Sequence, residues 1–276
     1  MSELVDAAVN PALAQKLANE AMKETKQVTV GVPEEVKPAP LPPDTSVELI
    51  AGYMDPVSGE VELQAEVREL NGVDEEALSR ITDMGKVLLT TLERGTAKIG
   101  NERASKEKLD ALLAGDRELL LVAIRKVTFG PEVKLEGACP LCGAENQTFD
   151  VDLDKDVKVR RLDDPTDRSF TVSCKVGEVD VQLPNGKTQA KLVSASDKTQ
   201  AELDTILLKD CIGAINGMPV WDIKQIQSLG IKDRREIIKQ LSERNPGPLL
   251  SEITKSCGSC GQEVPLPLTL ADLFRL

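Results

Sequence analysis

The spacing of apolar residues changes along the chain and divides it into segments. Residues 2–27 carry small apolar side chains at helical spacing, with Ser2 as a candidate N-cap, which predicts one helix with a shallow apolar stripe. Such a helix is marginal in water by itself, so we expect it to dock onto another surface. Residues 32–43 contain five prolines, which fix an extended backbone and indicate a linker or an extended arm.

Between residues 46 and 67 the apolar residues recur at every second position. They flank the turn-forming residues 55–59, so we expect two strands joined by a turn. Two helices are predicted next. The first opens at residues 71–76 with Asp74 near its cap, and the second includes residues 87–92.

Residues 105–129 carry the strongest helical pattern. Ser105 is a candidate cap for a helix that Gly115 and Asp116 would end, and Asp116 would then cap a second helix. This second helix contains the uninterrupted apolar run 119–124, which we expect in the centre of the core.

The next segment mixes both patterns. Alternating apolar residues between 170 and 183 lead to an Asn-Gly pair at 185–186, and such a pair between alternating runs predicts a β-hairpin. Helices are expected afterwards, one that begins at Ser196 or Asp197 and another that is capped by Asp233.

Two Cys-x-x-Cys-Gly motifs are the main chemical signal, with cysteines at Cys139, Cys142, Cys257 and Cys260. A tight turn lets both thiolates of one motif reach a single ion at about 2.3 Å, and the glycine permits a positive φ where the chain reverses. The two motifs together predict one structural zinc ion. Cys142 and Cys257 are 115 positions apart, so the zinc would hold both ends of a long inserted segment, at an entropic cost that grows only with the logarithm of its length.

Two other interpretations of the four cysteines are possible. They are buried free thiols, or a redox-active pair in one motif. A redox motif belongs at a helix N-terminus after a strand, and neither motif clearly has that context. Four thiolates would leave no coordination position for water or substrate, so a structural zinc is favoured over a catalytic one. Cys211 lies among apolar residues and is expected in the core, and Cys174 lies on a predicted strand without a ligand partner nearby.

These patterns predict an α+β fold, a mainly helical domain with a split four-cysteine zinc ribbon and an inserted β-plus-helix segment. An N-terminal helix and a Pro-rich arm precede this domain. The expected divisions are an N-terminal helix and arm, an α+β core, a zinc ribbon in two parts and an inserted β-hairpin with helices, at residues 1–45, 46–131, 132–156 with 251–276, and 157–250.

The composition argues against several classes of function. The 276 residues are 41% hydrophobic and carry a net charge of -12, so the surface as a whole repels a phosphate backbone, and nucleic acid is a poor candidate as main partner. We interpret the basic residues Lys158, Arg160 and Arg161 as part of a solvent-exposed face and not as a patch that binds nucleic acid. No apolar stretch is long enough to cross a bilayer and no signal peptide is visible, which indicates a reducing, cytosol-like compartment.

The search for catalytic chemistry gives no active site. Histidine, the commonest general base, is absent, and no glycine-rich nucleotide-binding loop is present. Asp150, Asp152, Asp154 and Asp156 would share one face of a strand and could bind a divalent cation, but a solvated strand face is the favoured reading. We therefore expect a protein that is not an enzyme.

Four blocks in a fixed order resemble the baseplate hub family of contractile-tailed bacteriophages of the T-even type. They are residues 67–76, residues 119–130, the Cys139 motif followed by residues 149–153, and the Cys257 motif followed by residues 264–267. The similarity spans roughly residues 47–276. The resemblance implies partnership with other baseplate and tail subunits and is compatible with zinc on the four cysteines, and it carries no active site.

The resulting functional hypothesis is a structural subunit of a phage tail baseplate, in the hub or an adjoining region, that mediates protein–protein assembly. We expect it in the virion after assembly in the host cytoplasm, in several copies of a symmetric structure. Two alternatives are an assembly chaperone that is absent from the mature virion and a zinc-ribbon nucleic-acid-binding protein.

Overall fold

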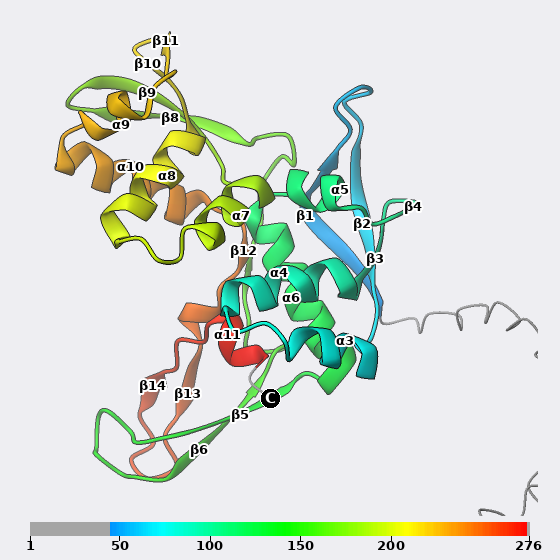
Figure 1. Cartoon of the computed structure of the whole chain (residues 1–276). Coiled ribbons are helices and arrows are strands. Elements are labelled where there is room, and N and C mark those ends of the chain that lie inside the picture. Colours follow the sequence, from blue (N-terminus) through cyan, green and yellow to red (C-terminus); the bar gives the residue numbers. More distant parts are fainter. Residues whose placement is uncertain (1–44, 275–276) are drawn as a thin grey trace, which may run out of the picture. The chain divides into compact units, whose positions relative to one another are not determined.

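The computed structural model describes residues 45–274. The helix predicted over residues 2–27 and the Pro-rich arm of residues 32–43 lie outside these described residues. All of the described residues belong to one compact unit. Its described part is mixed α/β rather than mainly helical, because short strands that form five antiparallel sheets account for much of the chain between the helices (Figure 1).

The first sheet contains the predicted pair of strands. Asp55 and Gly59 close the turn between them, since the Gly59 amide donates to the Asp55 carbonyl. Asn71 caps the next helix, and Asp74 completes a capping box with it, as expected from its predicted place near the cap. The strands run in the order β1-β2-β3-β4, and helices connect them or follow them: β1 (Ser46–Met54), β2 (Val61–Val67), α3 (Gly72–Leu78), α4 (Met84–Gly95), β3 (Thr96–Ile99), β4 (Glu102–Arg103) and α5 (Lys106–Ala111).

Helix α6 (Ala114–Phe129) is the centre of the main core, as its apolar run predicted. Ser105 caps α5 as expected. The prediction that Asp116 caps α6 is wrong, because α6 begins at Ala114 and Asp116 lies in its first turn. The Asp116 side chain is fully buried, and it accepts a hydrogen bond from a backbone amide of the distant strand β1 instead of capping its own helix.

Strand β1 bulges where it passes Asp116. Its register with β2 shifts between Glu48 and Tyr53, so the backbone of residues 50–52 turns away from the ladder. The Asp116 carboxylate accepts the amides of these three residues at 2.6–3.1 Å. Arg168 donates to the carbonyls of the last two, at 2.7 and 3.0 Å. Burial raises the pKa of Asp116, although the three amides and Arg168 favour its charged form.

The segment between the two cysteine motifs has its own sheet, in the order β11-β10-β9-β8, and its own apolar cluster. The hairpin predicted at Asn185 and Gly186 is wrong, because Asn185 caps a helix by accepting the amides of residues 187 and 188. The turn lies earlier, between Cys174 and Gly177. The elements are β8 (Ser169–Cys174), β9 (Gly177–Gln182), α7 (Gly186–Ser194), α8 (Gln200–Cys211), β10 (Ile212–Ile215), β11 (Met218–Pro219), α9 (Ile223–Gln227) and α10 (Ile231–Arg244).

Two helix starts in this segment also differ from the prediction. Thr199, not Ser196 or Asp197, caps α8. Gly230 takes the cap position of α10, and the buried Asp233 accepts the amides of Lys175 and Val176 in the β8–β9 turn, each at 3.1 Å. Asp233, like Asp116, satisfies backbone donors that are remote in sequence.

The remaining strands form pairs at the start and end of this inserted segment. β7 (Val159–Arg160) pairs with β12 (Gly247–Pro248) where the chain enters and leaves it. The pairs β5–β6 and β13–β14 are hairpins, and the short helices η2 and α11 complete the chain: β5 (Glu132–Gly137), β6 (Gln147–Asp152), η2 (Leu250–Glu252), β13 (Thr254–Ser256), β14 (Glu263–Pro265) and α11 (Leu270–Leu273). None of the helices in the described residues is long and apolar enough to cross a membrane.

The acidic run does not occupy one strand face, because β6 ends at Asp152. Asp154 pairs with Lys126 at 2.6 Å, and Asp156 pairs with Lys255 at 2.6 Å while it accepts the Asp152 amide. The carboxylates of Asp154 and Asp156 therefore form structural ion pairs.

We expect Asp116→Asn to lower the free energy of unfolding by about 3 kcal/mol, because an amide nitrogen would replace one of two oxygens that accept buried backbone amides. Urea denaturation followed by circular dichroism measures this change. Asp163→Asn, at an exposed position, is the matched control and should change the stability by less than about 0.5 kcal/mol. Equal stabilities for the two variants would contradict the assigned role of Asp116.

Candidate metal centre

The four cysteines of the two motifs lie at the tips of two hairpins. Cys139 and Cys142 are in the connection from β5 to β6, and Cys257 and Cys260 are in the connection from β13 to β14. Figure 1 shows these two hairpins side by side. Their four Sγ atoms all lie within 4.8 Å of one another.

The two motifs have the same backbone structure. The Cys139 amide donates to the Ala144 carbonyl and the Cys257 amide donates to the Gln262 carbonyl, each at 2.9 Å. The glycine after each second cysteine adopts a left-handed conformation, with φ of 72° at Gly143 and 69° at Gly261. This confirms the expected reason for glycine at both positions, because a Cβ is disfavoured there.

The sulfur positions fit a tetrahedral metal shell. Cys139 Sγ is 4.0 Å from Cys260 Sγ, and Cys142 Sγ is 3.9 Å from Cys257 Sγ. Four sulfurs at about 2.3 Å from a central zinc would be about 3.8 Å apart, which is close to these two separations. Each of these two close contacts joins one hairpin to the other. The cluster can therefore hold one ion, and all four of its ligands would be thiolates.

Apolar packing positions the cluster from one side. Cys139 and Cys257 are buried, whereas Cys142 and Cys260 are exposed. Phe149 of β6 and Val264 of β14 pack with the two buried cysteines, and they are 4% and 1% exposed. This apolar packing brings the two hairpins into contact next to the cluster.

Gln147 is a further residue of the site, which the sequence did not identify. Its Oε1 accepts from Ser259 Oγ at 3.2 Å and lies 3.7 Å from Cys257 Sγ. Gln147 precedes Phe149 on the same strand but is 110 positions from Cys257. No local motif signals this contact.

The backbone also favours a negative charge on one ligand. The amides of Cys260 and Ser259 point toward Cys257 Sγ, the latter at 3.4 Å, and they lower the pKa of the Cys257 thiol to about 6. A lower pKa favours the thiolate, which is the form that binds metal, at Cys257, whereas contacts with the neighbouring thiols raise the pKa of Cys142 to about 11.

The other two cysteines are outside the cluster. Cys211 is 1% exposed in the core of the inserted segment, and burial raises the pKa of its thiol to about 12. Cys174 is half-buried beside the same core. Arg160 of the basic run donates to the carbonyls of Ser242 and Asn245, so part of this run has a structural role instead of forming a purely solvated face.

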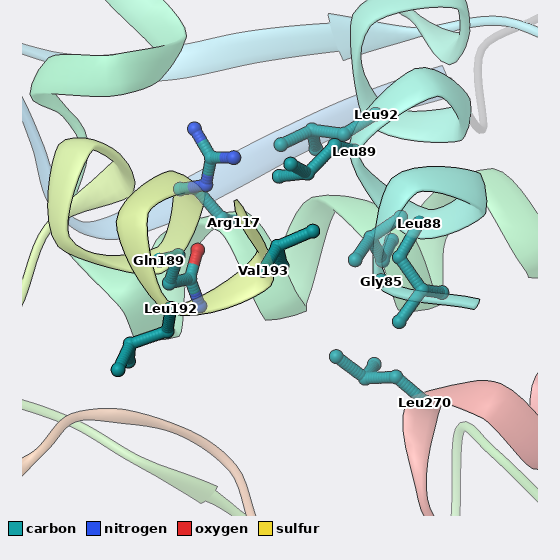
Figure 2. Close-up of a pocket in the computed structure, with 10 residues that line it drawn as sticks. Gly85, Leu88, Leu89, Leu92, Arg117, Gln189, Leu192, Val193 and Leu270 are labelled. Atoms are coloured by element: carbon teal, nitrogen blue, oxygen red, sulfur yellow. The ribbon is translucent and has the colours of Figure 1, made fainter. Parts of the chain in front are cut away.

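An apolar pocket lies apart from the cysteines, between α4, α6, α7 and α11 (Figure 2). Its polar members are Arg117 and Gln189. The Arg117 guanidinium donates to the Leu109 carbonyl at 2.7 Å, which holds it in the fold. The apolar lining residues are Gly85, Leu88, Leu89, Leu92, Leu121, Leu192, Val193 and Leu270. Within the described residues, this lining offers no pair of acid and base groups for catalysis.

A family model described as T4 bacteriophage base plate protein matches residues 64–275 of the chain. The matched region contains all four cysteines, α6 and the inserted segment. No curated protein and no solved structure matches the chain.

We expect Cys142→Ser to reduce the bound metal to less than about half of the wild-type amount and to lower the unfolding temperature, because three thiolates bind zinc more weakly and this binding contributes to folding. Elemental analysis of protein purified without chelator, followed by thermal denaturation, measures both effects. Cys174→Ser is the control that should retain the metal. Wild-type protein with less than half an equivalent of zinc would contradict the expectation.

Proposed function

The chain belongs to the T4 bacteriophage base plate protein family, and from this premise we propose that it is a structural subunit of the phage tail baseplate. Its proposed place is the hub or an adjoining region, where it mediates protein–protein assembly. The family match over residues 64–275 is the observation that carries this proposal.

The proposed cofactor is one structural zinc ion bound by Cys139, Cys142, Cys257 and Cys260. The support is the chemistry of the donor set: four thiol sulfurs lie within 4.8 Å of one another, and two of their separations, 4.0 and 3.9 Å, are close to the edge of a tetrahedral zinc–thiolate shell. A complete thiolate shell leaves no position at which the ion could activate water. Its proposed contribution is to hold the β5–β6 and β13–β14 hairpins together, and with them the two ends of the inserted segment.

The proposed partners are other baseplate and tail subunits. A structural subunit acts through surfaces rather than through a reactive centre, and the family is one of baseplate proteins. A net charge of -12 disfavours a role in binding free nucleic acid. The proposed setting is therefore a symmetric assembly with several copies of the chain.

We expect peptides of this chain in purified, infectious virions, in amounts comparable to those of established tail proteins, because a structural subunit stays in the particle. Quantitative mass spectrometry of density-purified particles measures this. A phage-encoded enzyme of DNA metabolism is the control for contamination and should be depleted. If the chain is abundant in infected cells but absent from the particles, the proposal fails in favour of a transient assembly chaperone.

A further inference from the structure

Strand β8 is the outer strand of the second sheet and pairs only with β9. The register of this pair has no bulge. Directly before β8, the Leu183 amide donates to the Arg168 carbonyl at 2.8 Å. Residues of an antiparallel pair alternate between bonding to the partner strand and pointing their backbone groups away from it, so this bond fixes the pattern. Ser169, Thr171 and Ser173 therefore direct their amides and carbonyls to the open side of β8.

This open edge lacks the sequence features that commonly protect edge strands. Among residues 45–274, no hydrogen bond joins the backbone of Ser169, Thr171 or Ser173 to another group. Their side chains are exposed and uncharged. Edge strands are commonly kept from pairing by charged side chains, proline, a bulge or a very short length. β8 has six residues and contains no proline and no charged residue, so it is a template to which a further strand can add.

The two faces of β8 specify which strand fits beside it. Its even-numbered residues pack on the apolar core of the inserted segment. On the opposite face, the Thr171 hydroxyl donates to Asp180 of β9 at 2.9 Å and the Ser173 hydroxyl donates to Glu178 of β9 at 2.7 Å. Side chains of adjacent strands contact each other on each face. A fitting strand therefore alternates apolar residues with small or polar, uncharged ones.

Residues 28–32, which lie outside the described residues, have this pattern. Three valines alternate there with Thr29 and Gly31. Valine and threonine are β-branched and favour strands. Pro33 follows directly, and proline is excluded from the interior of a sheet. The sequence therefore predicts a short strand that ends at residue 32.

Charged residues occur only at the ends of the possible pairing. Lys26 and Glu34 are the nearest charges on either side of residues 28–32, and Asp167 and Lys175 are exposed beyond the two ends of β8. Arg168, next to Asp167, already donates to two carbonyls of β1. A parallel pairing brings Lys26 toward Asp167 and Glu34 toward Lys175, whereas an antiparallel one brings like charges together. Charge complementarity thus favours the parallel direction.

We propose that residues 28–32 of one copy add to the open edge of β8 in a second copy of this chain, in the parallel direction. The inference rests on the proposed structural role in a multi-copy assembly and specifies one contact within it. Val32 and Thr45 are 13 positions apart, which span at most about 45 Å when extended. Figure 1 shows the beginning of β1 well apart from β8, so the acceptor is assigned to a neighbouring copy.

The test uses the full-length chain as a mixture of unlabelled and heavy-isotope-labelled protein. As the protein concentration rises from about 1 to 100 µM, a range that detects modest affinities, light scattering after size-exclusion chromatography should show an increase in mass. An amine-reactive cross-linker followed by mass spectrometry should join Lys37 of one isotopic form to Lys175 of the other. Lys37 is the first lysine after residues 28–32, so the parallel direction places it near Lys175.

Three variants make the test specific. Thr171→Pro removes an outward amide only, and proline is tolerated on the solvent side of an edge strand. Val30→Asp places a charge in the added strand. Each should weaken self-association at least about tenfold, and their combination should weaken it no further than either alone, because both remove the same contact. Val36→Asp, beyond Pro33, is the matched control that should associate like wild type.

Several results would overturn the inference. These are a chain that stays monomeric at every concentration, cross-links that join only residues of the same isotopic form, and association that Val30→Asp leaves intact. Cross-links from Lys175 to Lys26 between copies would overturn the parallel direction. If circular dichroism shows that Thr171→Pro is unfolded, Val30→Asp decides, since its position lies outside residues 45–274. The proposed structural role stands apart from these results, and absence of the chain from virions would refute it separately.

Discussion

Four sulfur atoms that lie within 4.8 Å of one another impose the main constraint on this molecule. As thiolates without a cation they would repel one another, and as thiols they would form only weak hydrogen bonds. A divalent ion would remove this repulsion and would join two hairpins whose facing cysteines, Cys142 and Cys257, are 115 positions apart. The proposed zinc site would thereby set the distance between the two ends of the inserted segment, and its binding free energy would favour the folded chain.

The inserted segment is also connected to the main core through Arg168 and Asp116. These two side chains bind opposite backbone groups of the bulge in β1, the first its carbonyls and the second its amides. Asp116 belongs to α6, which is the central helix of the core. The core, the β1–β2 hairpin and the start of the inserted segment therefore share one polar contact. The proposed zinc site would add a second connection, between the two hairpins that flank the inserted segment.

The sequence predicted features whose signals are local. The helix of residues 119–124, the cap at Ser105 and the glycine after each cysteine pair follow from short-range rules, and the structure confirms them. The order of the sequence blocks indicated the baseplate family, which the family model confirms. Asp116 and Asp233 are close to helix starts, which predicts caps, whereas their buried carboxylates bind strands and turns far away in sequence. Gln147 also contacts a residue far away in sequence, and no local pattern indicates this contact.

The proposal with the widest consequences for the fold is that one zinc ion with four sulfur ligands holds the two hairpins together. X-ray absorption spectroscopy at the zinc edge, on full-length protein purified without chelator, examines the ligand shell itself. We expect a first shell of four sulfur atoms at about 2.3 Å and no nitrogen or oxygen ligand. A shell that contains oxygen or nitrogen, or protein that binds no zinc while Cys139, Cys142, Cys257 and Cys260 remain reduced, would contradict the proposal.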